Sequence, residues 1–108
     1  GIIAPGLRIA SEALFQRAAK LSRVELVKPK TVIGKNNIHS MQSGLIYGYI
    51  GLIEGLISRI KQEMSCNPKV VATGELAEIV AGETKMIDLI NSELTLEGLR
   101  IIYELNKN

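Results

Sequence analysis

The chain has 108 residues, of which 46% are hydrophobic and 22% charged, and its formal net charge is +2. This length suits a single domain, residues 1–108, with a modest core, and the composition is that of a folded globular protein rather than a disordered one. One cysteine and one histidine, Cys66 and His39, exclude an internal disulfide and a Cys/His zinc cluster on ligand count, and a reducing, cytoplasmic location is expected.

The charges are distributed unevenly along the chain. Residues 1–35 carry seven basic and two acidic side chains, whereas residues 36–108 carry six basic and nine acidic ones. A basic half can attract anions, but a solvated face completed by acidic residues elsewhere in a longer protein is the favoured interpretation. The four aromatic residues are too few for the stacking surfaces that bind single-stranded nucleic acid, so no nucleic-acid partner is expected.

The first elements are a strand end, a helix and a short extended segment. Three apolar residues at 1–4 run into Pro5-Gly6, a pattern typical of a buried strand that ends at a loop. A chain that starts with such a strand is predicted to be the back part of a larger protein. Leucine and alanine at helical spacing predict a helix over 7–21. Residues 24–27 alternate in polarity ahead of Pro29, which predicts a short strand or extended edge.

A long helix is predicted over residues 38–64, after a loop whose asparagines are good helix caps. Its most apolar part, residues 44–57, is shorter than the about 20 residues that a membrane-spanning helix needs, so no membrane partner is expected. Four glycines of this helix fall within an arc of roughly 60° around its axis and so share one face. They are Gly44, Gly48, Gly51 and Gly55. Close packing inside the protein is the favoured interpretation of this glycine face, and a subunit interface is the alternative.

The second half alternates strand and helix. The pattern predicts a buried strand at 69–73, a turn at Gly74, a helix at 76–81 and a strand at 86–90. A last helix is predicted to be capped by Thr95 and to bury Leu96, Leu99, Ile102 and Tyr103. This alternation predicts a helix-rich α/β fold.

No local motif supports a self-contained enzyme. The phosphate-loop, dinucleotide-binding, zinc-protease and serine-hydrolase signatures are missing. His39, just inside a helix, is interpreted as a capping or solvated residue. The passage from a strand through Thr73-Gly74 into a helix is more suggestive, because it exposes backbone N–H groups to a phosphorylated ligand.

Five segments in collinear order carry a resemblance to a known family. They read G-I-I-A-P-G-L at 1–7, I-G-K-N at 33–36, M-Q-S-G-L-I-Y-G at 41–48, A-T-G-E-L-A at 72–77 and L-T-L-E-G-L at 94–99. Together they cover essentially the whole chain, and it resembles the C-terminal portion of type III pantothenate kinase. Some members of that family carry the older label of Bvg accessory factor, a transcriptional activator.

The resemblance implies the C-terminal domain of an actin-like, acetate and sugar kinase (ribonuclease H-like) fold, in which two domains close around ATP. It implies ATP-dependent phosphorylation of pantothenate, the first step of coenzyme A synthesis, by a homodimer that uses Mg²⁺ and a monovalent cation such as K⁺ or NH₄⁺. The family's phosphate loops and its Gly-x-Asp-Arg segment, with the catalytic base and most of the cation contacts, precede the part matched here. The chain by itself is therefore expected to be inactive and to hold no catalytic or metal-binding residue.

Two binding sites carry over from the family, each with a departure. Asn37 stands where the family has a threonine that touches pantothenate, and Asn can still exchange hydrogen bonds there. Thr73, Gly74 and Glu75 match a turn beside the adenosine, where the family has a second glycine in place of Glu75. If that backbone needs a positive φ, Glu75 is penalised by about 1 kcal/mol or more.

Two alternatives to a kinase remain open from these residues. The departures at Asn37 and Glu75 favour a non-catalytic regulator of the Bvg accessory factor kind. A third interpretation is a stand-alone dimerisation domain built on the glycine face.

Overall fold

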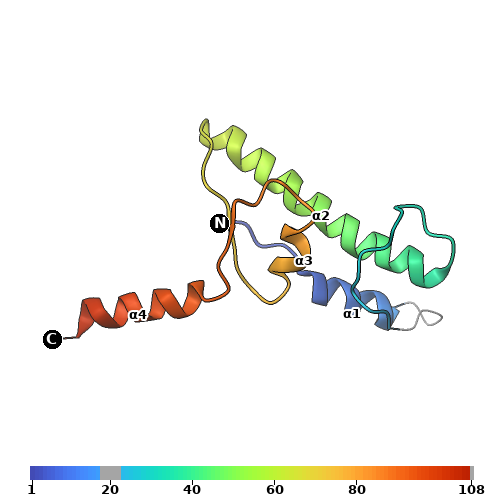
Figure 1. Cartoon of the computed structure of the whole chain (residues 1–108), viewed down its shortest axis with the longest axis horizontal. Coiled ribbons are helices and arrows are strands. Elements are labelled where there is room, and N and C mark those ends of the chain that lie inside the picture. The colour runs from blue at the N-terminus through green and yellow to red at the C-terminus, as the bar shows by residue number, and fades with distance from the viewer. Residues whose placement is uncertain (18–22, 108) are drawn as a thin grey trace. The chain divides into compact units, whose positions relative to one another are not determined.

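A computed structural model of the chain describes residues 1–17 and 23–107 (Figure 1). The order of its elements is α1, α2, β1, α3, β2 and α4. The chain divides into two compact units, residues 1–59 and residues 60–108.

The first unit begins with helix α1, Leu7–Arg17. The helix starts directly after Pro5-Gly6, and the backbone N–H of Ala10 donates to the carbonyl of Gly6 over 2.9 Å. Leu7 is only 2% exposed and Ser11 is also buried. The predicted helix is confirmed over residues 7–17, and its remaining part, residues 18–21, lies outside the described residues.

Two predicted strands of the first unit are absent from its described residues. Residues 1–6 have no regular structure, and Ile3 is fully exposed. Residues 24–27 also lack strand structure, and the chain bends there, with the N–H of Val27 donating to the carbonyl of Glu25. Both predictions are wrong because a strand requires a hydrogen-bonded neighbour, and no described segment pairs with either one.

Helix α2 spans Asn37–Met64 and confirms the long helix predicted at 38–64. Asn36 caps it, since its Oδ1 accepts a hydrogen bond from the backbone N–H of His39 over 2.8 Å. At the other end, Ser65 leaves the helix with a φ of 53°, ahead of Asn67-Pro68. Within the described ranges, no helix is both long and apolar enough to cross a bilayer.

The glycine face of α2 is uncovered. Gly44, Gly48, Gly51 and Gly55 are all exposed, and a Cβ atom added at any of them would meet no atom within 4 Å. The interpretation that the face packs closely inside the protein is therefore wrong for the described residues. A helix with four glycines on one open strip is free to approach a partner closely.

The second unit contains a small parallel β-α-β motif. Strand β1, Val71–Ala72, pairs with strand β2, Leu89–Ile90, and helix α3, Ala77–Ala81, lies in the connection between them. The motif confirms the predicted order of strand, helix and strand, and the α/β class. The prediction that the first strand is buried is wrong, because Val71 is 41% exposed; Leu89 of the second strand is 48% exposed. A sheet with two strands in the described chain covers few of its own side chains.

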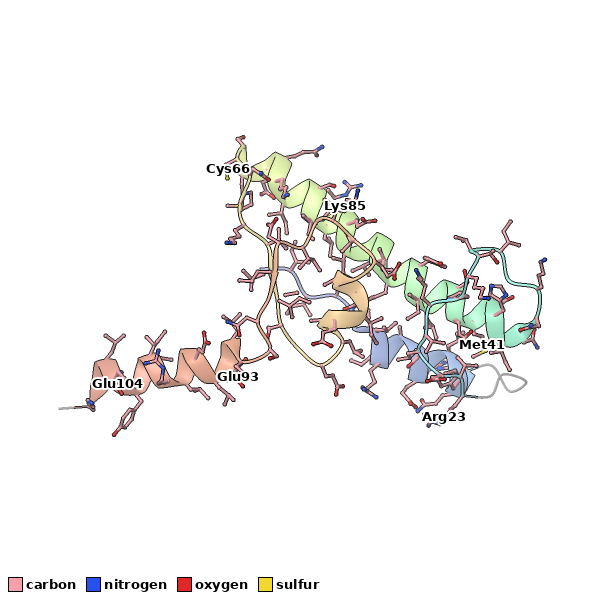
Figure 2. All side chains as sticks on the ribbon, viewed as in Figure 1. Arg23, Met41, Cys66, Lys85, Glu93 and Glu104 are labelled. Atoms are coloured by element: carbon pink, nitrogen blue, oxygen red, sulfur yellow. The ribbon has the colours of Figure 1, made fainter. Side chains whose placement is uncertain are left out.

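Helix α4, Leu94–Asn106, completes the second unit. Glu93 occupies the cap position, and Thr95 lies inside the first turn, so the predicted cap at Thr95 is wrong. No residue of α4 is buried. Figure 2 shows the side chains of this helix, which carries the labels Glu93 and Glu104. The side chains predicted to be buried are 58–65% exposed, namely Leu96, Leu99, Ile102 and Tyr103. That prediction is wrong because the described part of this unit packs no surface against the helix.

Candidate functional site

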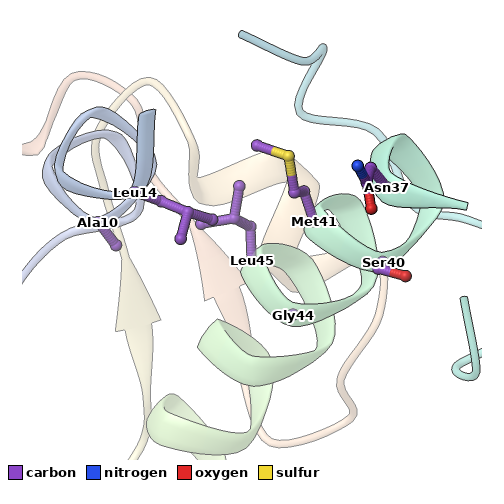
Figure 3. Close-up of a pocket in the computed structure, with 7 residues that line it drawn as sticks. All are labelled: Ala10, Leu14, Asn37, Ser40, Met41, Gly44 and Leu45. Atoms are coloured by element: carbon purple, nitrogen blue, oxygen red, sulfur yellow. The ribbon is translucent and has the colours of Figure 1, made fainter. Parts of the chain in front are cut away.

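A hollow with a polar rim lies between α1 and α2, in the first unit. Its volume is about 540 Å³. It is lined by Ala10 and Leu14 of α1 and by Asn37, Ser40, Met41, Gly44 and Leu45 of α2 (Figure 3). We call this hollow the α1–α2 groove.

The floor of the groove is apolar and its rim is polar. Leu14 and Leu45 point toward one another across the space between the two helices, as Figure 3 shows. Asn37, Met41 and Leu45 are spaced four residues apart, so they share one face of α2. The exposed Asn37 amide makes no hydrogen bond with another described residue, and it offers both donors and an acceptor to a ligand.

The turn before α2 sets the position of this rim. A Cβ atom added at Gly34 would lie 2.4–2.6 Å from the Oγ, Cα and N of Ser40, so only glycine fits against the first turn of the helix. Asn36 caps the same turn, and Asn37 follows as its first helical residue. The helix cap thus comes from Asn36, which leaves the Asn37 side chain available to the groove.

The sequence predicts a loop with capping asparagines, but not the specific roles of Gly34 and Asn36. The cap pattern itself was a usable signal, since Asn36 lies three residues before the N–H that it binds. The close approach of Gly34 to Ser40 has no local signal, because it depends on the path of the chain before the helix.

A second hollow, of about 260 Å³, adjoins the glycine face in the same unit. It is lined by Pro5, Leu7, Ala10, Gly44, Leu45, Gly48, Tyr49 and Leu52. It shares Ala10, Gly44 and Leu45 with the α1–α2 groove. The open glycine face is thus continuous with an apolar depression rather than with a charged surface.

The residues matched to the adenosine turn lie in the second unit. Thr73, Gly74 and Glu75 connect β1 to α3, and all three are exposed. Gly74 has a φ of 110°, whereas Glu75 has no positive φ. The backbone penalty expected for Glu75 therefore does not apply, since the glycine-dependent position is Gly74.

Two further polar residues of the first unit have structural partners. The Nε2 of His39 lies 2.9 Å from the carbonyl oxygen of Thr31, so the ring ties a loop to α2 and is neither a cap nor simply solvated. Arg23 hydrogen-bonds to Glu12 and lies over the ring of Phe15 at 5.8 Å. The hydrogen bond and the charge of Glu12 raise the pKa of the Arg23 guanidinium.

Among residues 1–17 and 23–107, no three histidine, cysteine, aspartate or glutamate side chains come together in an arrangement that could hold a metal ion. Mg²⁺ is usually bound through one or two carboxylates together with water and substrate phosphates.

Two comparisons with known proteins place the chain in a family. A family model described as type III pantothenate kinase matches residues 1–59, the part that holds the α1–α2 groove. A type III pantothenate kinase of Roseiflexus sp. (strain RS-1) is 57% identical over all 108 residues, which make up 42% of that protein. The chain thus spans less than half the length of the relative that it matches. The match confirms the resemblance seen in the sequence: this chain belongs to the type III pantothenate kinase family.

Proposed function

We propose that the protein containing this chain phosphorylates pantothenate with ATP, the first step of coenzyme A biosynthesis. The observation that carries this proposal is the 57% identity to a type III pantothenate kinase along the whole chain. The matched family and the relative are both named for the kinase, and neither comparison favours the non-catalytic regulator.

We also propose the architecture in which this activity resides. The chain would be the C-terminal portion of a two-domain cytoplasmic kinase with the actin-like, ribonuclease H-like fold. The β1-α3-β2 motif supports this assignment, since it is a small α/β unit of the kind that such a fold repeats. The catalytic base, Mg²⁺ and the monovalent cation would be held mainly by the other domain.

Within this chain, the α1–α2 groove is the proposed pantothenate contact. Pantothenate combines a branched aliphatic centre with hydroxyl, amide and carboxylate groups. Leu14, Met41 and Leu45 offer apolar surface to the aliphatic centre. The Asn37 amide can exchange hydrogen bonds with the polar groups. Thr73, Gly74 and Glu75 are the proposed contact to the nucleotide, supported by the turn that Gly74 makes after β1.

We further propose that the glycine face of α2 is the surface through which two copies form a homodimer. Its four open glycines and the adjoining apolar hollow allow two helices to approach more closely than larger side chains permit. A symmetric contact of this kind uses the same strip on both copies.

The chain of 108 residues alone is expected to lack kinase activity, because phosphoryl transfer depends on positioning and charge stabilisation by groups that the family carries elsewhere. The test is an assay of ATP-dependent pantothenate phosphorylation by the isolated chain and by the full-length protein. Turnover by the full-length protein but not by the isolated chain supports the proposal. Turnover by the isolated chain contradicts the proposal that the catalytic groups lie outside these 108 residues. An inactive full-length protein contradicts the function itself.

In the full-length protein, Asn37→Ala is expected to raise the KM for pantothenate about threefold to tenfold, which corresponds to the loss of one hydrogen bond. Asn37→Thr, which installs the residue typical of the family, should restore the KM.

The neighbouring residue provides the matched control. Asn36→Ala removes the cap of α2 and should lower the free energy of unfolding by about 1 kcal/mol. Asn37→Ala should leave the free energy of unfolding almost unchanged. Steady-state kinetics and urea unfolding of both variants measure the two effects, and a Thr variant as impaired as the Ala variant would exclude Asn37 as a contact.

A further inference from the structure

Residues 25–33, a segment without regular secondary structure, are attached to one side of α2 through their backbone carbonyls. Four α2 side chains make these bonds: Gln42 to Glu25 over 3.1 Å, Tyr47 to Pro29 over 2.7 Å, His39 to Thr31 over 2.9 Å, and Ser43 to Val32. We call this set of bonds the loop clamp. Because a carbonyl oxygen only accepts, the His39 Nε2 and the Tyr47 hydroxyl are the donors.

The clamp occupies a defined strip of the helix. His39, Ser43 and Tyr47 follow one another at intervals of four residues and therefore lie on successive turns of one face. Their bonds satisfy carbonyls that a strand ladder would otherwise satisfy. The segment thus pairs with side chains of α2 rather than with another backbone.

The clamped segment leads directly into the rim of the α1–α2 groove. Directly after Val32 and Ile33, Gly34 crosses against Ser40, and Asn36 caps the helix before Asn37. Both ends of this short path are therefore fixed to α2, one by the clamp and one by the cap. A change in the clamp alters the constraint on the turn that carries the groove's polar rim.

Tyr47 is the clamp residue farthest along α2 from Asn37. Ten residues separate them, which is about 15 Å along a helix axis. Tyr47 does not line the groove, it is half-buried, and its hydroxyl bonds to the carbonyl of the buried Pro29. Tyr47 therefore makes no direct contact with a ligand in the groove, and its bond to Pro29 gives it an indirect route through the clamped segment.

We propose that Tyr47 is a positioning residue for the acceptor substrate: its bond to Pro29 holds the segment that places Asn37 at the rim. This inference rests on the proposed function, in which pantothenate is the ligand of the groove. The expected signature is a selective weakening of pantothenate binding, without a loss of the chemical step or of ATP binding.

The experiment uses Tyr47→Phe in the full-length kinase, with Tyr103→Phe as the control. The control makes the same chemical change on exposed α4, where the Tyr103 side chain is 65% exposed. Tyr47→Phe is expected to raise the KM for pantothenate about fivefold, the effect of one hydrogen bond. The kcat and the KM for ATP should change less than twofold, and Tyr103→Phe should match the wild type in all three constants.

A second measurement separates the clamp from the activity. Lys30 and Lys35 are exposed trypsin sites within the clamped segment and the turn after it, and Lys28 is followed by proline, which blocks trypsin. Cleavage after Lys30 and Lys35 should be several times faster in Tyr47→Phe than in the wild type or in Tyr103→Phe. Mass spectrometry of the fragments identifies the sites.

Faster cleavage with a selective rise in the KM for pantothenate supports the proposal. An unchanged KM, or a parallel change in kcat and both KM values, overturns the positioning role even if cleavage is faster. If the wild-type protein neither turns over nor binds pantothenate, the proposed function has failed and the positioning role fails with it. The cleavage rates then still decide whether Tyr47 holds the segment.

Discussion

Gly34→Ala is expected to lower the free energy of unfolding by about 1–3 kcal/mol, the range for forcing extra atoms into a well-packed place. Its Cβ would lie within 2.6 Å of the backbone N and Cα of Ser40, distances that these atoms cannot keep. Because the obstacle is backbone in the first turn of α2, and not the end of a flexible side chain, the turn itself must move. The variant should therefore also weaken pantothenate binding in the full-length protein.

The control for Gly34→Ala is the same substitution at Gly98, inside α4, where a Cβ would also meet nothing within 4 Å. Alanine in a helix interior is favoured over glycine by about 1 kcal/mol, so Gly98→Ala is expected to raise the free energy of unfolding. Urea unfolding of the two variants gives the comparison. Equal effects of the same sign would contradict the close approach of Gly34 to Ser40.

Gly48→Leu is expected to abolish dimerisation or weaken it by at least a factor of ten, which corresponds to about 1.4 kcal/mol. Gly48 lies in the middle of the open strip and beside the apolar hollow, so a leucine there would hold two α2 helices apart. The measurement is sedimentation velocity of the full-length protein over a dilution series.

Gly48→Ala is the matched variant for this test. It adds one methyl group to open space and should weaken the dimer much less than Gly48→Leu does. Circular dichroism should show no loss of helix content in either variant, since a Cβ atom at Gly48 meets no atom within 4 Å and both residues are better helix formers than glycine. A dimer that survives Gly48→Leu with the wild-type dissociation constant would place the subunit contact elsewhere.

The bounds of the long helix and the order of the elements in the second unit could be predicted from the sequence, because they depend mainly on residues close together along the chain. The bounds of α2 were predicted to within one residue, because a long apolar repeat and a capping asparagine define both the helix and its start. The order of β1, α3 and β2 was predicted as well, since Pro, Gly and β-branched residues mark each change of element.

Burial was predicted poorly, because it depends on surfaces distant in the sequence. Leu96 and Tyr103 have the spacing of a buried helix face, yet α4 meets no covering surface in the described unit. Residues 24–27 alternate as a strand does, but the carbonyl of Glu25 accepts a hydrogen bond from the Gln42 side chain of α2 instead of from a neighbouring strand. In the candidate site, the resemblance indicated Asn37, whereas Gly34, Ser40 and the α1 side of the groove became visible only in three dimensions.

The glycine face has a thermodynamic consequence for the whole protein. Four glycines in place of alanines lower the intrinsic stability of α2 by about 4 kcal/mol. In the proposed homodimer, association of two such faces would offset this loss. Folding and assembly are then linked by mass action, as they are whenever a partner binds only the folded state. In the proposed homodimer, protein concentration acts as a stabilising variable, and the melting temperature rises with it.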